Sequence, residues 1–247
     1  DEYSFVSPIG KSPKGNHIAA RLLGSEVHPG GILACANHLA NFCGNVDLVT
    51  AIGNYDKEEF VSSHLKPNIK LHLFKHESAP TIVKRRFIDN AFLAKLFEIY
   101  VIEDRLSLHL EGKIKKRLTD LFFDVKHHDL VLVLDYGHGL FTPALRKFLC
   151  STSHFLAVNA QTNTANLGFN PITKYNRASY FCLDDKELRL AYQDNSSDIN
   201  ILVRRLARRA TFPRVVTVTR GHLGATTYDA KNSKFFEAPV LSQKIVD

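Results

Sequence analysis

The stretch HHDLVLVLDYGHGLF, residues 127–141, decides the fold predicted for this chain. Its apolar run, residues 130–134, ends at Asp135, and Gly137 and Gly139 follow directly. A short run that is apolar on both faces is typical of a central parallel strand covered by helices above and below. Ligands of such sheets bind beyond the carboxyl ends of the strands, where glycines let a ligand approach the backbone. Asp135 is therefore the first candidate for a binding residue.

Asp135 has a second interpretation, as the cap of the following helix. A helix is predicted to begin near Pro143. Thr142 is the better candidate for that cap, because Pro143 then occupies the first helical position. The sequence leaves both interpretations of Asp135 open.

The composition is that of an ordinary folded domain. Of the 247 residues, 45% are hydrophobic and 23% are charged, which is enough to form a substantial core. No apolar stretch is long enough to cross a bilayer and no signal-peptide pattern opens the chain, so a cytoplasmic protein without a membrane partner is expected. The four cysteines are widely spaced in apolar runs, which indicates buried thiols rather than disulfides or a zinc site.

Strands and helices alternate outward from the central stretch. Strands are predicted at 46–52, 69–74, 130–134, 154–158, 180–183, 215–219, 225–228 and 234–238. Helices are predicted from the Gly30-Gly31 turn and at 57–65, 106–125, 143–149, 184–190 and 197–209. This alternation predicts an α/β fold with a doubly wound, mostly parallel sheet and helices on both faces.

Two pairs of predicted strands stand outside this alternation. Residues 4–6 and 17–22 are extended pieces between prolines and glycines, and residues 81–89 and 95–101 form a hairpin with a turn near Asn90. We interpret these strands, within residues 1–29 and 81–102, as a small β-strand lid. Residues 30–80 and 103–247 would then form the α/β core of a single domain.

Several short motifs, taken together, resemble the PfkB (ribokinase-like) carbohydrate kinases, most closely the heptose-7-phosphate kinase domains. The matching segments are Asp1-Glu2-Tyr3, Ser12-Pro13, Gly30-Gly31, Asp135-Tyr136-Gly137-His138-Gly139, Asp184 with Glu187, and Thr217 to Gly224. The order and spacing of these motifs make the resemblance specific, although each glycine motif alone would be weak.

The resemblance implies transfer of the γ-phosphoryl group of ATP, with Mg²⁺, to a hydroxyl of a sugar or sugar phosphate. Ile245-Val246-Asp247 is similar to the start of the family's Val-Asp-x-x-Gly-Ala-Gly-Asp motif. The catalytic aspartate is therefore expected beyond Asp247, and the first sheet strand before Asp1, so that the sequence is interpreted as an excised segment. Family members often pair through their lids, so a homodimer through the lid strands is expected.

Acids and amides are expected to hold the sugar hydroxyls. The resemblance points to Asp1, Asn37 and Asp135 as ligands, with the backbone of Gly30 and Gly31 allowing close approach. The family pattern places an asparagine at Ala34, so this contact is lost or shifted one turn to Asn37. A solvated helix residue is the alternative interpretation of Asn37.

Lys84 and Arg86 are candidates for binding the non-transferred phosphate of a sugar phosphate. Both lie in a predicted strand, where alternate residues share a face, and Arg85 would then point the opposite way. Arginine gives bidentate geometry to such a site. The alternative is a charged edge strand that resists aggregation.

The nucleotide side is expected to contain Asp184, Thr219, Gly221 and Gly224, with Glu187 holding Mg²⁺ through water. For Asp184 and Glu187 the alternative is a helix capping box, which is compatible with a functional role. For the Thr219 to Gly224 segment the alternative is a plain turn after a strand.

Four departures from the family pattern support a rival function. Ala34, His138, Gln161 and Asp184 replace family residues, and Gln161 stands where a lysine is common. A sugar-phosphate-binding or regulatory module that has lost turnover is therefore the alternative to a kinase.

A nucleic-acid partner is not predicted. The net charge of +7 suits either nucleic acid or phosphorylated substrates. The predicted helix with Arg204, Arg205, Arg208 and Arg209 carries a basic stripe without interleaved aromatic residues, which favours a solvated face.

Overall fold

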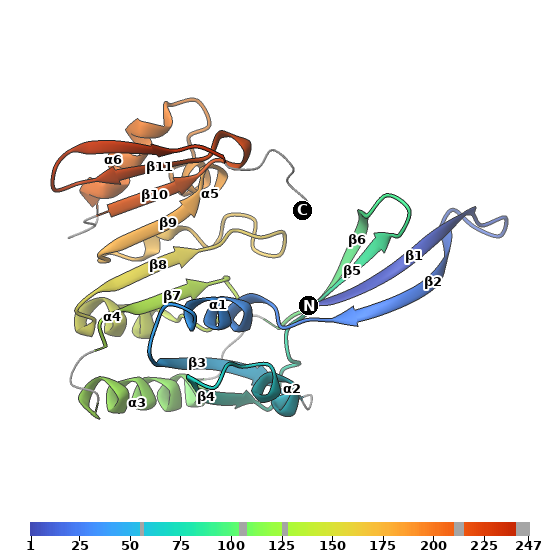
Figure 1. Ribbon diagram of the computed structural model, residues 1–247, viewed down its shortest axis with the longest axis horizontal. Coiled ribbons are helices and arrows are strands. Elements are labelled where there is room, and N and C mark those ends of the chain that lie inside the picture. Colours follow the sequence, from blue (N-terminus) through green and yellow to red (C-terminus); the bar gives the residue numbers. More distant parts are fainter. Residues whose placement is uncertain (55–56, 104–107, 125–127, 210–214, 241–247) are drawn as a thin grey trace. The chain divides into compact units, whose positions relative to one another are not determined.

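The structure is a computed structural model that describes residues 1–54, 57–103, 108–124, 128–209 and 215–240 (Figure 1). The chain forms two compact units, Asp1–Glu103 and Asp104–Asp247. The proposed grouping of residues 30–80 with residues 103–247 in one core stays a prediction. The Ile245-Val246-Asp247 motif lies outside the described residues.

A four-stranded sheet in the first unit corresponds to the predicted lid strands. Its order is β2-β1-β5-β6, formed by β1 (Glu2–Lys11), β2 (Ile18–Val27), β5 (Val83–Asp89) and β6 (Ala94–Val101). The first two strands are longer than predicted. Strand β1 continues through Pro8 and Gly10 because register shifts at Phe5/Val6 and Pro8/Gly10 absorb the irregular residues.

The first unit also contains a small α/β layer. Strands β3 (Val46–Gly53) and β4 (Ile69–His76) pair in parallel in a sheet of their own, with helices α1 (Gly31–Leu39) and α2 (Glu58–Ser63) beside them in the sequence. Their shared core consists of Leu33, Ala36, Leu48, Ile52 and Val61. All four elements were predicted from periodicity.

The second unit is built on a six-stranded sheet of order β12-β11-β10-β9-β8-β7. Strands β7 (Val131–Asp135), β8 (Leu156–Ala160), β9 (Tyr180–Asp184) and β10 (Val215–Thr219) are parallel. Strand β11 (Ala225–Asp229) pairs antiparallel with β10, and β12 (Lys234–Ala238) pairs antiparallel with β11. The helices are α3 (Leu108–Asp124), α4 (Pro143–Thr152), α5 (Asp185–Tyr192) and α6 (Ile199–Arg209), with 3₁₀ turns η1 (Ile172–Lys174) and η2 (Gly221–Leu223). The predicted mixed α/β class, with parallel strands and intervening helices, is confirmed.

The prediction that residues 130–134 form the central strand of their sheet is wrong within this unit. Strand β7 ends the order of its sheet instead of lying at the centre. Val133 is 2% exposed, whereas Leu132 is 39% exposed. Within the described part of this unit β7 has a strand partner on one side only, so its other backbone edge has no strand partner there.

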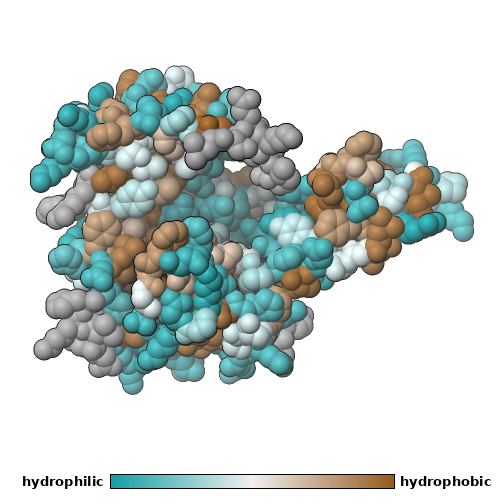
Figure 2. Space-filling model, viewed as in Figure 1, coloured by the Kyte–Doolittle hydropathy of each residue, from teal (hydrophilic) through white to brown (hydrophobic). Residues whose placement is uncertain are grey.

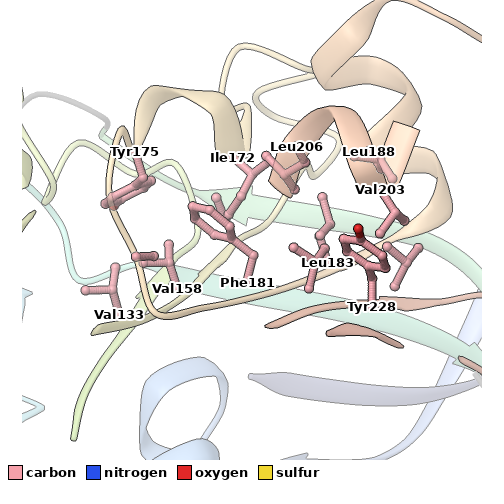
Figure 3. Close-up of a cluster of buried hydrophobic side chains, with 14 of the residues drawn as sticks. Val133, Val158, Ile172, Tyr175, Phe181, Leu183, Leu188, Val203, Leu206 and Tyr228 are labelled. Carbon is pink, nitrogen blue, oxygen red and sulfur yellow. The ribbon is translucent and has the colours of Figure 1, made fainter. Parts of the chain in front are cut away.

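The core of the second unit lies between the sheet and helices α5 and α6 (Figure 3). Phe181 from β9 and Val216 and Val218 from β10 are fully buried against Leu202 and Val203 of α6. The arginine stripe of α6 is exposed, with Arg204 over the Phe235 ring and Arg205 over the Tyr192 ring. The solvated face stays a prediction. None of the described helices is long and apolar enough to cross a membrane.

Candidate functional site

The parallel strands of the second unit bring several predicted site residues to one edge of the sheet. Asp135 ends β7 opposite Ala160 at the end of β8, and Asp184 ends β9 opposite Thr219 at the end of β10. Side chains that follow parallel strands share the carboxyl edge, where ligands of α/β sheets bind. The structure therefore groups Asp135 with the predicted nucleotide-side residues Asp184 and Thr219 along one edge.

Asp135 is 3% exposed and its carboxylate is fully engaged. Oxygen Oδ2 accepts from the Tyr175 hydroxyl at 2.6 Å and lies 2.6 Å from the Lys174 ammonium. Oxygen Oδ1 accepts from the Gly137 amide at 2.9 Å and from the Asn170 side chain at 3.4 Å. A carboxylate offers about four lone-pair positions. A sugar hydroxyl would therefore have to exchange with one of these donors.

The helix-cap interpretation of Asp135 is wrong. The Thr142 side chain caps α4, because its hydroxyl accepts from the Leu145 amide at 3.3 Å with Pro143 at the first helical position. Asp135 instead anchors the turn that follows its own strand.

Burial and charge shift the ionisation of both side chains that contact Asp135. Burial, followed by the charge of the Asp135 carboxylate, raises the pKa of Tyr175 far above its usual range, so that the phenol stays a donor. Burial lowers the pKa of Lys174, and the Asp135 carboxylate opposes this shift. The result is a buried ion pair with a neutral hydroxyl donor beside it.

An asparagine-rich loop after β8 holds the turn that follows β7. Asn163 and Asn166 donate to the Tyr136 carbonyl at 2.7 and 3.2 Å. Gly137 has φ of +75°, and a Cβ there would lie 2.3 Å from the Asn166 amide nitrogen. Glycine is therefore required at residue 137 both for its backbone conformation and for the close approach of this loop.

Glu187 is held inside the chain by two backbone donors. Its carboxylate accepts from the Asp184 amide at 2.8 Å and from the Thr162 amide at 2.9 Å, while Asp184 accepts from the Glu187 amide at 2.6 Å. The capping-box interpretation is thus confirmed. Burial raises the pKa of Glu187. The charge of Asp184 adds to this shift, and the hydrogen bonds from the two backbone amides oppose it.

A magnesium ion at Glu187 would have to be bound mainly through water. Among the residues that the structure describes, no group of three or more histidine, cysteine, aspartate or glutamate side chains is arranged to hold a metal. Each oxygen of Glu187 keeps a second lone pair beside its backbone donor. Mg²⁺ often retains several of its waters, so the residue fits a water-mediated contact.

The turn after β10 contains two glycines with different surroundings. Gly221 has φ of +54°, and a Cβ there would meet no described atom within 4 Å. Gly224 has φ of +82°, and a Cβ there would lie 2.0 Å from the Ala238 carbonyl oxygen. The plain-turn interpretation therefore accounts for Gly224, while open space adjoins Gly221.

This contrast gives a matched pair of substitutions. Gly224→Ala combines an unfavourable positive φ with overlap against the β12 backbone, and we expect it to lower the free energy of unfolding by about 2–4 kcal/mol. Gly221→Ala carries only the cost of the positive φ, about 1 kcal/mol. Urea unfolding of both variants is the measurement, and equal losses would contradict the role of the Ala238 contact.

In the first unit, the predicted residues Asp1, Gly30 and Arg86 lie together. Arg86 donates to the Asp1 carboxylate at 2.9 Å and also lies 3.4 Å from Glu98. A Cβ at Gly30 would lie 2.0 Å from Asp1 Oδ2, so glycine allows the carboxylate to approach the start of α1. Gly31, with φ of +50°, is the first residue of that helix.

Lys84 and Arg86 share a face, as predicted. Strand register places them opposite Tyr100 and Glu98, and Arg85 pairs instead with Glu2 at 2.7 Å. Burial, and then the charge of Arg86, lowers the pKa of Lys84. The edge-strand alternative is wrong, because β5 lies between β1 and β6.

Asn37 joins α1 to the segment before β4. Its amide donates to the His64 carbonyl at 2.7 Å, and its carbonyl oxygen accepts from the Lys66 amide at 3.0 Å. The solvated-helix interpretation is therefore wrong. A contact between Asn37 and a sugar hydroxyl stays a prediction.

The arrangement of strands and helices is similar to that of solved sugar kinases. Phosphofructokinase-2 from Escherichia coli, in complex with fructose-6-phosphate, matches with a TM-score of 0.69 at 14% identity over 98% of this chain and 78% of its own. Ribokinase from Giardia lamblia matches with a TM-score of 0.64 at 17% identity over 96% and 76%. The chain has a ribokinase-like fold.

A third structure with the ribokinase-like fold is named for its phosphoryl donor. It is a pyrophosphate-dependent kinase of the ribokinase family, solved as a sulfate complex, with a TM-score of 0.58 at 15% identity over 98% of this chain and 78% of its own. No family model and no curated protein matches the sequence. At these identities the likeness establishes the fold, and a closer relationship to heptose-phosphate kinases stays a prediction.

Sequence reasoning missed the residues that surround Asp135 in this ribokinase-like fold. Lys174 and Tyr175 follow Asp135 by about forty positions and come from the η1 turn and the residue after it. The one visible signal was the spacing of Asn163, Asn166 and Asn170, since three asparagines in eight residues are typical of a loop that bonds to backbone. That signal does not reveal which strand the loop contacts.

Proposed function

We propose that the chain is a cytoplasmic carbohydrate kinase that transfers the γ-phosphoryl group of ATP to a hydroxyl of a sugar or sugar phosphate, with heptose phosphates as first candidates. The main supporting observation is the ribokinase-like fold shared with two structures whose names are those of sugar kinases. The grouping of Asp135, Asp184 and Thr219 at the carboxyl edge of the second sheet adds support.

We propose the following roles on the substrate side. Asp1 and Asn37 would hold hydroxyls, with Gly30 and Gly31 allowing close approach, and Lys84 and Arg86 would bind a non-transferred phosphate. Asp135 would accept a hydroxyl by exchanging one of its present donors. Hydrogen bonding of hydroxyls to charged or amide groups is what orients a sugar for in-line transfer.

On the nucleotide side, Asp184, Thr219, Gly221 and Gly224 would line ATP, and Glu187 would hold Mg²⁺ through water. The ion would neutralise charge on the phosphates, which is the main requirement of phosphoryl transfer.

The kinase proposal is tested by product release from the full-length natural protein. ADP release is measured with Mg²⁺, ATP and a panel of sugars and sugar phosphates. Release of ADP that depends on one sugar or sugar phosphate is the expected result. Phosphate release from pyrophosphate is measured in parallel, because one neighbour uses that donor. A folded protein that releases neither product with any acceptor would contradict the kinase proposal.

A binding or regulatory module is the second candidate. Its specific support is that the carboxylates of Asp135 and Glu187 are already occupied by donors of the chain itself. Calorimetric titration separates the two functions. Binding of a sugar phosphate without binding of ATP would favour the module.

We further propose that two copies pair through the four-stranded sheet. Ile18, Leu22, Leu96, Phe97 and Ile99 are 44–74% exposed on these strands, and the first four of them line a groove of about 810 Å³. Figure 2 shows apolar patches on the surface of this sheet. Exposed apolar patches of this kind commonly mark protein interfaces.

Charged substitutions on this sheet are expected to separate the subunits. Leu22→Asp and Phe97→Asp place a carboxylate where an apolar contact is proposed, so we expect the apparent molecular mass in sedimentation to fall by about half, as desolvating a charge is unfavourable. Phe42→Asp is the control, since Phe42 is 77% exposed in the turn after α1. A dimer that survives both sheet variants would place the interface elsewhere.

A further inference from the structure

Two cations lie near one carboxylate beside the turn that follows β7. Lys174 pairs with Asp135 at 2.6 Å, and the Arg146 guanidinium donates to the Phe141 carbonyl. The Phe141 carbonyl lies in the loop between β7 and α4, so this bond holds Arg146 against the same loop. Burial is the main cause of the lowered pKa of Lys174 and of the raised pKa of Tyr175, and the positive charge of Arg146 makes a smaller contribution that favours a lower pKa in both. Two positive groups and one negative group leave an excess of one positive charge in a largely buried cluster.

The Lys174 ammonium keeps one donor for a ligand. An ammonium has three N–H groups. Two of them have acceptors in the chain, namely Asp135 Oδ2 and the Asn170 side-chain oxygen. In the portion of the chain that the structure describes, the third N–H has no oxygen acceptor, and the Lys174 side chain is 18% exposed. The ammonium also lies 5.6 Å from the centre of the Tyr175 ring.

Asn170 fixes the position of this ammonium. Its amide nitrogen donates to the backbone carbonyls of Asp135 at 2.8 Å and Gln161 at 3.1 Å, so its oxygen is directed to Lys174. Asn170 is 3% exposed, and a buried side chain with every group bonded has little freedom to rotate. The cation is therefore preorganised at the carboxyl ends of β7 and β8.

The turn beside this cation contains two glycines with left-handed backbone conformations. Gly137 and Gly139 have φ of +75° and +81°, in the turn between β7 and α4. The space beside Gly137 is filled by the side chains of Asn166 and Asn170. Gly139 has no side chain to shield its backbone. The carboxyl edge of a parallel sheet is the usual ligand site of α/β folds.

We propose that Lys174 and Arg146 form a phosphate-binding site at the carboxyl end of β7, in which Asp135 and Asn170 act as positioning residues. Given the proposed function, on which the ligand's identity rests, the phosphate belongs either to the phosphoryl donor or to a sugar phosphate. An anionic phosphate oxygen would accept from the third N–H of Lys174 and balance the excess positive charge.

The site is tested by calorimetric titration of the full-length protein with three probes: inorganic tripolyphosphate, ADP and fructose 6-phosphate. We expect at least one probe to bind, with an affinity that falls as salt is added. If the variants described below lose affinity only for tripolyphosphate and ADP, the site belongs to the phosphoryl donor. If they lose affinity only for fructose 6-phosphate, the site belongs to the acceptor.

Four variants isolate the cations. Arg146→Gln should weaken binding of each probe that the wild-type protein binds by about tenfold or more. The double variant Asp135→Asn with Lys174→Gln should have the same effect. The double variant removes both members of the ion pair, so that no buried charge is left without its partner. Lys174→Arg should retain affinity within about threefold because the charge remains. Lys147→Gln changes an exposed lysine of α4 and is the matched control, so the affinity for the probe should stay unchanged.

Thermal unfolding establishes that each variant is folded, and Arg146→Gln provides the test if the double variant does not fold. Wild-type affinity in a folded Arg146→Gln variant, or binding of none of the probes by the wild-type protein, would overturn the proposal. Sugar-dependent ADP release with unchanged affinity in the variants would reject this site and leave the kinase intact. Binding that requires Lys174 without any product release would support the site and reject the kinase.

Discussion

Asp135→Ala is expected to lower the free energy of unfolding by about 3–5 kcal/mol, because breaking a buried ion pair leaves an uncompensated charge. The substitution removes the acceptor of both the Lys174 ammonium and the Tyr175 hydroxyl, each 2.6 Å from Oδ2. It also removes the acceptor of the Gly137 amide. Urea unfolding, followed by circular dichroism, measures the loss.

Two further variants show whether the ion pair causes this loss. Asp129→Ala changes an exposed aspartate just before β7 and should alter the unfolding free energy by less than about 0.5 kcal/mol. Asp135→Ala combined with Lys174→Met removes both charges, so it should recover a large part of the loss. If Asp135→Ala alone costs less than about 1 kcal/mol, the buried pair does not stabilise the fold as argued.

Phe181→Ala is expected to lower the free energy of unfolding by a similar amount, about 3–5 kcal/mol, through lost burial and the cavity left behind. Phe181 is 0% exposed in β9 and packs among Val158, Ile172 and Leu183 (Figure 3). Because these neighbours come from strands and the η1 turn, the cavity cannot close by movement of a single side chain. Urea unfolding again provides the measurement.

The control for this prediction is Phe169→Ala in the same unit. Phe169 is 92% exposed, so the same chemical change removes little buried surface and should cost less than about 0.5 kcal/mol. Similar losses for both variants would show that Phe181 does not lie in a well-packed core.

The fold was largely predictable because its signals are local. Helix α6 was predicted from apolar residues at helical spacing, and the structure buries Ile199, Leu202, Val203 and Leu206. The caps were also predictable, since Thr142 and the Asp184–Glu187 pair bond to amides within three residues. Such contacts depend on the order of residues along the chain and on little else.

The candidate site was predictable only in part. The carboxyl edge followed from the apolar run before Asp135 and from the glycines after it. The partners of Asp135 were not predictable, because Tyr175 is 40 residues away and Asn170 is 35 residues away. Strand pairing brings such segments together, and no local pattern records which of several strands a loop will contact.

The sequence by itself determined the α/β class, the positions of most helices and strands, and the resemblance to ribokinase-like kinases, because periodicity, caps and glycine turns are properties of neighbouring residues. Only the tertiary structure decided that β7 ends its sheet, that Asp135 is paired with Lys174 and Tyr175, and that Arg86 binds Asp1. These features depend on the register between strands distant in sequence and on burial, which strengthens charge pairing and determines which donors remain for a ligand.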